Sequence, residues 1–285
     1  MATLVIGATG NVGREVIRAL KDINHDTIAA VGSLERSIAF PLEKTVLFDF
    51  ATPATWEAAL DNVDKVFLLR PPAISDVKKH IFPFIDMATE KGIKQIVFLS
   101  LQGVQFNPLT PHNKIERYIR KKKTPYTFLR PNFFMQNLTT FYKDDITKRD
   151  EIYLPAGMGK TAFIDVRNIG DIVARVLSED GHLGKAYTLS GGESLDYYEV
   201  ASILSAVTKR CITYKNPSTN KYVERLRRNK ADKDFIMVQK MLYFVVRHNF
   251  SSSTTSSTAE LLGRQPISFR EFASDNAAAW RASTA

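Results

Sequence analysis

The feature that most constrains this chain is a glycine-rich turn close to its start, within the stretch TLVIGATGNVGREV at residues 3–16. An apolar run precedes the turn and a helical pattern follows it, so Gly7, Gly10 and Gly13 lie between a predicted strand and a predicted helix. Glycines let the backbone turn tightly and approach a pyrophosphate, which then meets the amide groups of the helix N-terminus. We therefore predict a dinucleotide site here, the alternative being a turn that uses glycine only for close packing. The residues expected to contact the dinucleotide at this turn are Gly7, Thr9, Gly10, Asn11, Val12, Gly13 and Arg14.

The first half of the chain alternates segments that are typical of strands with segments that are typical of helices. The strand-like segments are residues 3–7, 27–31, 45–50, 65–69, 95–100 and 126–131. Helical patterns lie between them, among them an amphipathic stretch at 76–92 that ends at Gly92 and another at 110–125. This alternation predicts the α/β class, with a Rossmann-type, doubly wound parallel sheet that is covered by helices on both faces.

The second half of the chain is less regular. We expect a helix over 164–179, a strand over 186–191 that completes the sheet, and a helix over 195–210. A basic helical stretch follows at 221–248, then a polar, mobile surface loop at 251–258 and a return to helix at 259–280. The patterns predict an NAD(P)-binding Rossmann domain at 1–150, completed by 164–191, and a smaller, mainly helical substrate-side region at 151–285.

The formal charge of +9 comes mainly from two basic runs, at 117–123 and 221–233. Charge runs are usually solvated helix faces, so nucleic acid is not an expected partner, and attraction of an anionic cofactor is a simpler use of the charge. No apolar run approaches the ~20 residues that cross a bilayer, and the N-terminus lacks a signal-peptide pattern. The single cysteine, Cys211, agrees with a reducing compartment. We expect a cytoplasmic protein with no membrane partner.

The end of the second predicted strand bears on which dinucleotide is bound. An NAD site usually has an acidic side chain there to accept the ribose hydroxyls, but this chain has Gly32 or Ser33 at that position. Arg14 and Arg36 could reach the 2′-phosphate of NADP(H), although both could equally be surface residues. The pattern favours NADP(H) over NAD(H).

Several motifs together resemble one known family. GATGNVG at 7–13, IVFLSLQG at 96–103 and YTFLRPNFFMQN at 126–137 occur in the order seen in NmrA-like proteins, which are atypical short-chain dehydrogenases. AFIDVRNIGDIVARVL at 162–177 is also similar to that family. The group includes NAD(P)H-dependent quinone reductases, reductases of dyes and alkaloid iminium ions, and catalytically silent NADP(H) sensors.

The resemblance implies further contacts with the cofactor. Asp49 and Phe50 would flank the adenine, whereas the segment 68–72 would line the ribose and pyrophosphate through Leu69, Arg70 and Pro71. The residues expected to border the nicotinamide are Pro131, Asn132 and Phe133. Each has a structural alternative, because Asp49 could cap a strand end and the phenylalanines could be core residues.

Tyr118 and Lys122 reproduce the spacing of the catalytic Tyr-x-x-x-Lys pair of short-chain dehydrogenases. Ligands of open α/β sheets bind beyond the carboxyl ends of the strands, so the helix that begins near Pro111 starts close to the cofactor and runs away from it. Both residues fall in the distal half of that helix. We therefore predict that they are not catalytic.

By alignment with the family, His112 occupies the place of the catalytic lysine and Pro108 that of the tyrosine. Proline cannot exchange a proton, so tyrosine-driven alcohol oxidation is not expected. His112 could orient the nicotinamide ribose or donate a proton, or it could be a structural residue; Glu116 is its partner at i+4 or a surface charge. Ser100 could remain from the usual serine position or only cap a turn. No histidine pattern indicates a metal site.

The leading functional hypothesis is an NAD(P)H-dependent reductase that transfers hydride to an electron-poor small molecule such as a quinone. Acceptors of this kind need little help from a protein acid, because water can protonate the product. Phe133, Phe134 and Tyr243 are candidate walls of the acceptor site, with core packing as the alternative. The second hypothesis is a binding protein that senses NADP(H) without turnover. The sequence does not define the oligomeric state.

Overall fold

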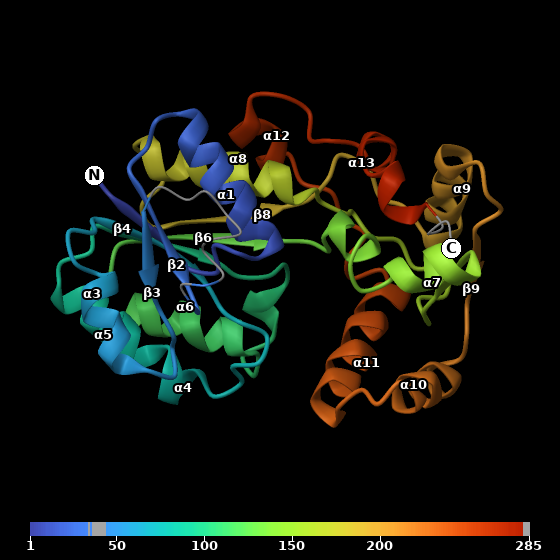
Figure 1. Ribbon diagram of the computed structural model, residues 1–285, viewed down its shortest axis with the longest axis horizontal. Helices are drawn as coiled ribbons and strands as arrows, with labels where there is room; N and C mark the ends of the chain where they lie inside the picture. Colours follow the sequence, from blue (N-terminus) through green and yellow to red (C-terminus); the bar gives the residue numbers. More distant parts are fainter. Residues whose placement is uncertain (34, 36–43, 282–285) are drawn as a thin grey trace. The chain divides into compact units, whose positions relative to one another are not determined.

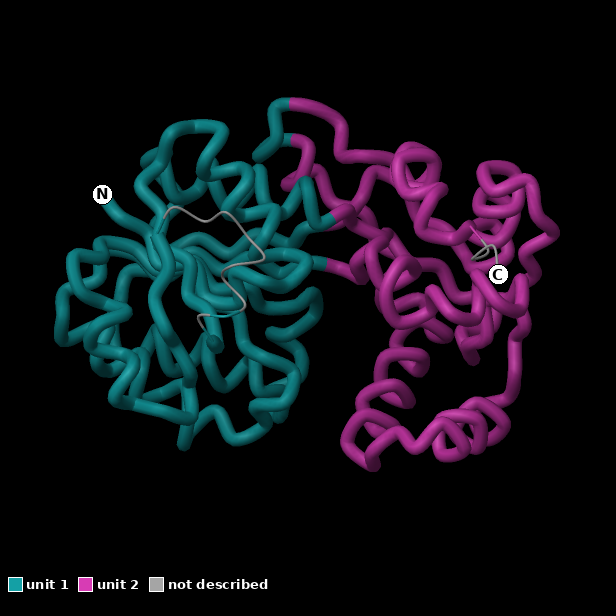
Figure 2. The backbone as a smooth tube through the Cα atoms, in the orientation of Figure 1, with its two compact units in different colours: residues 1–131, 166–189, 260–263 teal, residues 132–165, 190–259, 264–285 magenta. Residues whose placement is uncertain are grey.

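The computed structural model describes residues 1–33, Glu35 and 44–281, which form two compact units. Unit 1 comprises residues 1–131, 166–189 and 260–263, whereas unit 2 comprises 132–165, 190–259 and 264–285 (Figure 2). The chain therefore leaves unit 1 after Pro131 and returns to it at Val166. Arg36, predicted to approach the cofactor, lies outside the described residues.

Unit 1 is built on a seven-stranded sheet in the order β3-β2-β1-β4-β5-β6-β8, with every neighbouring pair parallel. The predicted doubly wound α/β class is thus confirmed. The strand order changes direction between β1 and β4, which is where such sheets leave a crevice at their carboxyl ends. The strands are β1 (Thr3–Val5), β2 (Thr27–Val31), β3 (Thr45–Leu47), β4 (Lys65–Leu69), β5 (Gln95–Leu99), β6 (Tyr126–Pro131) and β8 (Lys185–Leu189).

Helices cover both faces of this sheet (Figure 1). On one face α1 (Asn11–Asp22) and α8 (Val166–Ser178) pack against each other, and a Cβ at Gly170 would come within 2.5 Å of the Glu15 carbonyl oxygen. The other face carries α3 (Trp56–Ala59), preceded by the short helix η1 (Pro53–Thr55), then α4 (Val77–His80), α5 (Phe82–Glu90) and α6 (Pro111–Lys121). The short helix η2 (Val104–Phe106) precedes α6.

The prediction of one helix over 76–92 was wrong in one respect. The segment forms two helices, α4 and α5, because Pro83 has no amide hydrogen and cannot continue the hydrogen-bonding of α4. Gly92 ends the segment as expected, with φ at +75°. The third strand is also shorter than the predicted 45–50, since Phe48 and Phe50 turn into an aromatic cluster with Phe84.

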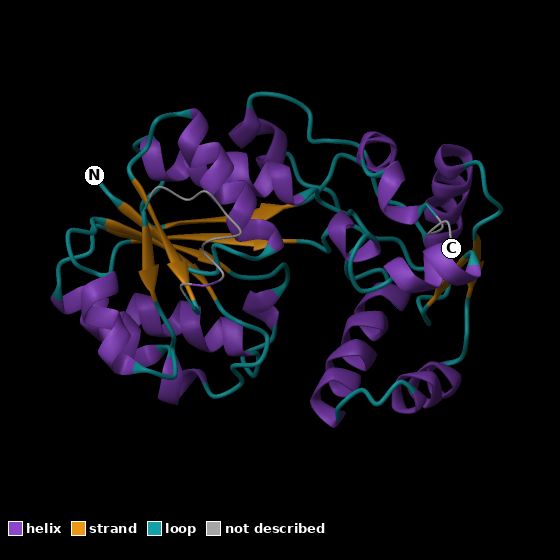
Figure 3. Cartoon of the chain, in the orientation of Figure 1, coloured by secondary structure: helices purple, strands orange, loops and turns teal. Residues whose placement is uncertain are grey.

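Unit 2 has little strand structure, as Figure 3 shows. Its two short strands, β7 (Glu151–Tyr153) and β9 (Thr213–Lys215), pair in parallel. A core rich in buried aromatic side chains, including Tyr197, Phe269 and Trp280, holds its helices together. The helices are η3 (Met135–Leu138), α7 (Lys143–Arg149), α9 (Tyr197–Thr208), α10 (Thr219–Arg228), α11 (Lys233–Arg247), α13 (Phe269–Asp275) and η4 (Ala277–Trp280), while α12 (Ser257–Leu262) contributes residues to both units.

Two predictions for this unit need correction, and a third is confirmed. The basic stretch 221–248 is helical as predicted and forms two helices, because the chain breaks after α10 and Asp232 caps α11 by accepting from the Phe235 amide. The segment 251–258 is not a loose surface loop: the Ser251 carbonyl accepts hydrogen bonds from the backbone of Ala162 and the side chain of Asn132. These hydrogen bonds hold the segment in place although it forms no strand. The helix expected over 259–280 is interrupted, and the chain is extended around Pro266 before α13 begins.

Candidate functional site

The glycine-rich turn joins β1 to α1 in a conformation that requires glycine. Gly7 has φ at +79°, and its carbonyl oxygen accepts a hydrogen bond from the Gly10 amide at 3.0 Å. A Cβ at Gly13 would lie 2.1 Å from the Gly7 carbonyl oxygen, which no real side chain tolerates. The first turn of α1 can therefore sit directly on the preceding loop only because Gly13 has no side chain.

The N-terminus of α1 has backbone amides that find no acceptor within the helix. Gly10 is the N-cap, with no side-chain hydrogen bond to the first turn from the described part of the chain, and that turn contains no acidic residue. The amides of Asn11, Val12 and Gly13 thus lie at the positive end of a helix dipole. Arg14 is exposed beside them, and its Nε donates to the Thr9 carbonyl at 2.9 Å. Backbone amides and a positive charge at one helix N-terminus suit a pyrophosphate.

The ends of β2 and β3 carry three further predicted residues. Ser33 follows β2 and is partly buried, while no acidic residue stands at the end of that strand. Asp49 is exposed and caps the turn after β3 by accepting from the Ala51 amide at 2.9 Å. The ring of Phe50 is only 3% exposed and belongs to the aromatic cluster, so any contact between Phe50 and a cofactor has to come from its backbone.

Arg70 follows β4, the strand beside β1. Leu69 lies next to the turn, within 3.3 Å of where a Gly7 Cβ would be. The Arg70 Nη1 donates to three backbone carbonyls, those of Pro71, Pro72 and Ile74, and so shapes the loop. The Nε is buried without a partner, and among the described residues no carboxylate pairs with this guanidinium. Burial lowers the pKa of Arg70, but a guanidinium stays charged, so a positive charge remains after β4 with no carboxylate partner in the described part of the chain.

Other buried polar atoms of unit 1 also lack partners within the described residues. Ser100 follows β5 and is 5% exposed, and its Oγ makes no hydrogen bond, so it does not cap the turn. Two further buried oxygens, Gln102 Oε1 and Asn113 Oδ1, also form no hydrogen bond with a described residue. Asn113 lies in the first turn of α6. Buried polar groups are normally paired, and such exceptions often mark a ligand or an ordered water. These atoms come from the loop after β5 and the start of α6, beyond the carboxyl end of the sheet.

His112 lies in the first turn of α6, one residue after Pro111. Its ring stacks on Phe98 with the centroids 5.9 Å apart, and neither ring nitrogen bonds another described residue. Burial, with a smaller contribution from the Arg70 charge, lowers the pKa of His112 from 6.5 to about 3. The imidazole is therefore neutral at physiological pH, and it can donate or accept a hydrogen bond but cannot supply a proton as an imidazolium.

Glu116 does not pair with His112 and is not a surface charge, so both expectations for it were wrong. It is 1% exposed and accepts from Arg130 Nε and Nη2 at 2.9 and 2.6 Å. A carboxylate buried this deeply requires a bidentate partner, and Arg130 on β6 supplies it.

Tyr118 and Lys122 are occupied elsewhere. The Tyr118 hydroxyl donates to Asp86 of α5 at 2.8 Å, and Lys122 Nζ lies 2.7 Å from the same carboxylate. The Tyr118 ring stacks on Phe82 at 3.8 Å. Burial and then the bond to Asp86 raise the pKa of Tyr118, whereas a catalytic tyrosine needs a lowered one. This geometry agrees with the prediction that the pair is not catalytic.

The three residues predicted to border the nicotinamide straddle the exit from unit 1. Pro131 is the buried last residue of β6, and its carbonyl accepts from the Gln102 amide at 2.9 Å. Asn132 begins unit 2, where its side chain donates to the Ser251 carbonyl and accepts from the Phe133 amide. Phe133 packs against the unit 2 core, and Tyr243, a candidate wall of the acceptor site, is 3% exposed within that core.

The residues at the carboxyl edge of unit 1 fit a nicotinamide dinucleotide. Gly13 leaves room for a close approach, the α1 amides and Arg70 match a pyrophosphate, and the unpaired oxygens beyond β5 match hydroxyl or amide donors. These groups follow different strands at the carboxyl edge of one parallel sheet, which is where folds of this class bind such ligands.

Comparison with known proteins shows the family of this chain. The NmrA-like family matches residues 2–273. The chain belongs to the NmrA-like family. It is 29% identical over 287 residues to the NAD(P)H azoreductase of Xenophilus azovorans, covering 98% of this chain and 99% of that protein. It is 28% identical to the prestalk A differentiation protein A of Dictyostelium discoideum, covering 96% and 92% of the two chains.

Solved structures show the same fold in other proteins. This NmrA-like chain is similar to the NADPH-dependent quinone oxidoreductase of Escherichia coli in its NADPH complex, with a TM-score of 0.86 and 22% identity. The similarity covers 96% of this chain and 99% of that one. None of the helices in the described ranges is long and apolar enough to span a membrane.

Sequence reasoning on this NmrA-like chain missed Gln102 and Asn113 as site candidates. Both belong to types that are common on exposed loops, and only their burial with an unpaired oxygen distinguishes them. The position of Asn113 directly after His112 in the first helical turn was an available signal. The lack of a carboxylate partner for Arg70 had no signal in the sequence, since it depends on the folding of the whole loop.

Proposed function

We propose that this NmrA-like protein is a reductase that binds NADP(H) at the carboxyl edge of the unit 1 sheet and passes hydride to an electron-poor small molecule such as a quinone. The observation that carries the proposal is the Arg70 guanidinium, which follows β4, the strand paired with β1, and has no carboxylate partner among the described residues. A pyrophosphate supplies the missing negative charge, and binding it there places a dinucleotide along the ends of β1 and β4.

The residues assigned to this cofactor fall into groups along the crevice. The turn amides and Arg70 hold the pyrophosphate, whereas Asp49 and the backbone of Phe50 lie toward the adenine and Pro131 toward the nicotinamide. Ser100, Gln102 and Asn113 offer acceptors to the ribose or the nicotinamide amide. Asn132 and Phe133 complete the nicotinamide end in this proposal.

The proposed preference for NADP(H) over NAD(H) rests on the residues near the end of β2. Ser33 takes the place of the usual acid, and the exposed Arg14 lies in the first turn of α1, close enough to the turn to bond the Thr9 carbonyl. An acid there would repel a 2′-phosphate, and an arginine attracts it. Arg14→Ala is therefore expected to raise the KM for NADPH about tenfold and to leave the KM for NADH almost unchanged.

The chemistry requires little from side chains. A bound nicotinamide supplies the hydride, so the protein has to orient two rings and exclude competing geometries. His112 is neutral, and we assign it a hydrogen bond that orients the nicotinamide ribose rather than the role of a proton donor. Because His112 does not act as the acid in this proposal, an acceptor whose reduced form takes its proton from water is favoured, such as a quinone or a related electron-poor ring.

The relatives support this choice of acceptor, since one is named an azoreductase and another a quinone oxidoreductase. We further propose that unit 1 serves as the cofactor-binding domain, that the region 151–285 serves the acceptor, and that the protein acts in the cytoplasm. The dependence on NADPH and the single cysteine suit that compartment.

The direct test follows the absorbance of NADPH and NADH with purified protein, a panel of simple quinones and one azo dye. We expect NADPH oxidation with quinones, slower oxidation of NADH, and a large loss of both in Arg70→Met. Tight binding of NADPH with no turnover of any acceptor would contradict the reductase proposal and favour a sensor. Absence of NADPH binding would contradict the cofactor assignment itself.

A further inference from the structure

Unit 2 contains a pocket of its own, with a volume of about 470 Å³. Its walls come from the segment before α7, from α7 and β7, and from α10 and α11, all within this unit. The volume lies within the range of pockets that hold small organic ligands. The lining includes the aromatic residues Phe141, Tyr142, Tyr153, Tyr222 and Phe235.

Gln239 lines the pocket, and only the oxygen of its side-chain amide forms hydrogen bonds with other described residues. The side chain is 7% exposed, and its Oε1 accepts hydrogen bonds from Tyr222 at 3.0 Å and from Tyr142 at 3.4 Å. Tyr142 in turn bonds the hydroxyl of Tyr243. No bond of the Gln239 nitrogen to another described residue is formed, and this nitrogen is not among the fully enclosed atoms. A fixed NH₂ donor is thus presented to the pocket.

The tyrosines hold this amide in one orientation. Burial raises the pKa of Tyr142 to about 12, and burial also raises the pKa of Tyr222, so both hydroxyls stay protonated. As donors they occupy the oxygen of Gln239, which leaves the nitrogen for a ligand. This accessible donor is not satisfied by another described residue, so it can donate a hydrogen bond to an acceptor on a ligand.

The charged residues of the lining already have partners. Arg225 lies between Asp145 and Glu151, at 2.5 and 2.7 Å, and its guanidinium covers the Tyr153 ring at 4.1 Å. Arg149 also pairs with Asp145, and Asp144 pairs with Lys148. An ionic ligand would compete with these pairs, whereas a neutral ligand would not disturb them.

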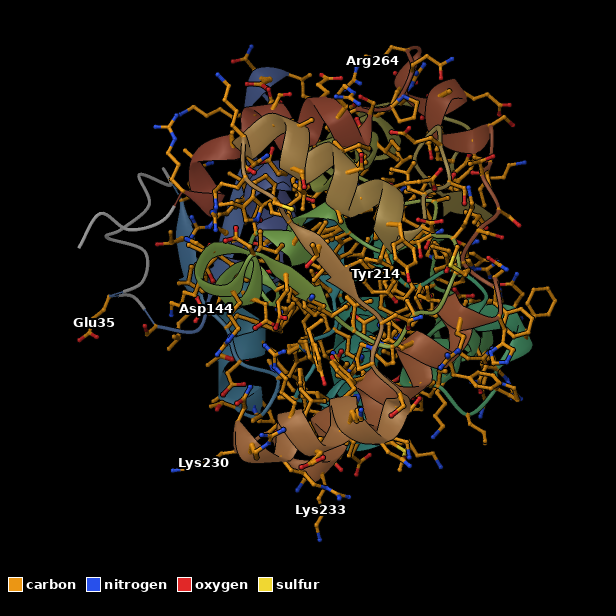
Figure 4. The ribbon with its side chains drawn as sticks, turned by 90° about the vertical axis from the view of Figure 1, so that its right-hand side faces the viewer. Glu35, Asp144, Tyr214, Lys230, Lys233 and Arg264 are labelled. Atoms are coloured by element: carbon orange, nitrogen blue, oxygen red, sulfur yellow. The ribbon has the colours of Figure 1, made fainter. Side chains whose placement is uncertain are left out.

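The basic residues near α10 and α11 do not change this preference for a neutral ligand. Lys230 and Lys233 lie at the turn between the two helices, and both are exposed. Figure 4 shows their side chains projecting away from this end of unit 2 into solvent. Neither is part of the pocket lining.

The aromatic side chains define the shape of the ligand. Phe141 and Phe235 lie 6.5 Å apart, and Tyr153 and Tyr222 lie 6.3 Å apart, each pair with its rings tilted by 36°. Phe141 is 68% exposed, so apolar surface here faces solvent. Planar aromatic molecules stack favourably on such faces and bury them.

We infer that this pocket binds a neutral, planar aromatic molecule through a carbonyl oxygen that accepts a hydrogen bond from Gln239. The inference does not depend on the proposed hydride transfer, because the binding that it describes requires no cofactor and no turnover. It assigns unit 2 a small-molecule site with defined chemistry.

The experiment uses N-methylacridone, a neutral, fluorescent, planar ring system with one carbonyl, titrated into the full-length protein without NADPH. We expect saturable binding to one site with a Kd on the order of 10 μM. The matched ligand control is the N-methylacridinium cation, which keeps the ring system but replaces the carbonyl by a charge. It should bind at least about tenfold more weakly. Equal binding of the two compounds would overturn the role of the carbonyl.

Variants locate the site. Gln239→Glu keeps an acceptor for the tyrosines but removes the NH₂ donor, and Phe235→Ala removes one wall, so each should weaken binding about tenfold. Met237→Ala is the control on the same helix, since this side chain is 67% exposed and does not line the pocket, and it should bind as wild type. Thermal unfolding checks that each variant is folded. No saturable binding to the wild type, or unchanged binding in Phe235→Ala, would overturn the inference.

Discussion

The two units of the chain treat polar groups in different ways. In unit 1 the sheet satisfies the backbone, and unpaired polar side-chain atoms gather beyond its carboxyl edge, at Arg70, Ser100, Gln102 and Asn113. Unit 2 has only two short strands, and its side chains supply much of the missing pairing, as when Trp280 Nε1 donates to the Leu138 carbonyl across its core. Many polar side chains in unit 2 therefore serve the fold, although the buried Thr147 Oγ1 and Ser194 Oγ also form no hydrogen bond with a described residue.

This difference shows how to separate ligand-binding groups from structural ones in a chain with both. Arg70 and Arg225 are both partly buried arginines. Arg225 pairs with two carboxylates, whereas among the described residues Arg70 bonds only backbone carbonyls. A charge that the protein leaves uncompensated is a better indicator of a ligand than burial alone. The predictions below test this distinction.

The largest effect is expected from a pair of glycines, one in each unit. A Cβ at Gly13 would lie 2.1 Å from the Gly7 carbonyl oxygen, and one at Gly159 would lie 2.0 Å from the Val246 carbonyl oxygen. Both Gly13→Ala and Gly159→Ala should lower the free energy of unfolding by about 3 kcal/mol. Only Gly13→Ala should also weaken NADPH binding, by on the order of 100-fold, because it moves the turn. Calorimetric titration and urea unfolding measure the two effects, and an equal loss of NADPH affinity in both variants would break the comparison.

The arginines give the next largest effect. Arg70→Met removes the uncompensated charge and should raise the Kd for NADPH roughly 30-fold, equivalent to about 2 kcal/mol. Arg225→Met leaves Asp145 and Glu151 without their shared partner, so it should lower the free energy of unfolding by about 2 kcal/mol and leave the Kd unchanged. If Arg70→Met changed only stability, its charge would be structural after all.

Substitution of His112 should affect kcat more than the affinity for NADPH. His112→Asn removes the ring that orients the nicotinamide, so kcat should fall about tenfold while the Kd for NADPH stays nearly constant. Because the pKa of His112 is about 3 in the folded protein, the pH profile of the wild type should show no break near the ordinary value of 6.5. A break there that His112→Asn abolishes would show an imidazolium acting as an acid.

The lowered pKa of His112 should also make the stability of the protein depend on pH. The folded-state pKa is lowered, so below pH 6.5 the unfolded chain binds a proton that the folded protein resists until the pH approaches about 3. The wild type should therefore lose more stability than His112→Asn when the pH falls through this window. Urea midpoints at both ends of the window measure the difference, and identical pH slopes would mean that burial does not disfavour the charged ring.

Tyr118→Phe should have the smallest effect. The hydroxyl bonds Asp86, which keeps Lys122 as a partner, so the loss should be about 1 kcal/mol of stability with kcat unchanged. Steady-state kinetics with NADPH and a quinone would decide, and a collapse of kcat would return the residue to the catalytic machinery.

Much of unit 1 could be predicted from the sequence, because its information is local. The period of the apolar residues marks the strands, Pro111 and Thr110 mark the start of α6, and the three glycines mark the turn. The errors arose where a single residue overrides the pattern, as Pro83 does between α4 and α5. Glu116 was misjudged because its partner Arg130 is distant in sequence.

Unit 2 was less predictable because its structure depends on long-range side-chain bonds. The segment 251–258 has the composition of a loop, yet Ser251 is 2% exposed and Thr258 is fully buried. Its order comes from bonds such as that of the Ser190 amide to Thr258 Oγ1, which no local pattern shows. The orientation of Gln239 in the pocket also depends on long-range bonds, since its tyrosine partners lie 17 and 97 residues away.

The most direct test of the central claim is the amide spectrum of ¹⁵N-labelled protein during titration with NADP⁺. The account predicts large shifts for the amides of Asn11, Val12 and Gly13 and for the Arg70 Nε–H signal, which the Arg70→Lys spectrum identifies. Amides around Asp86 and Tyr118 should move little. Saturable binding that leaves the turn and the Arg70 signal unchanged would contradict the account, because the dinucleotide would then be bound elsewhere.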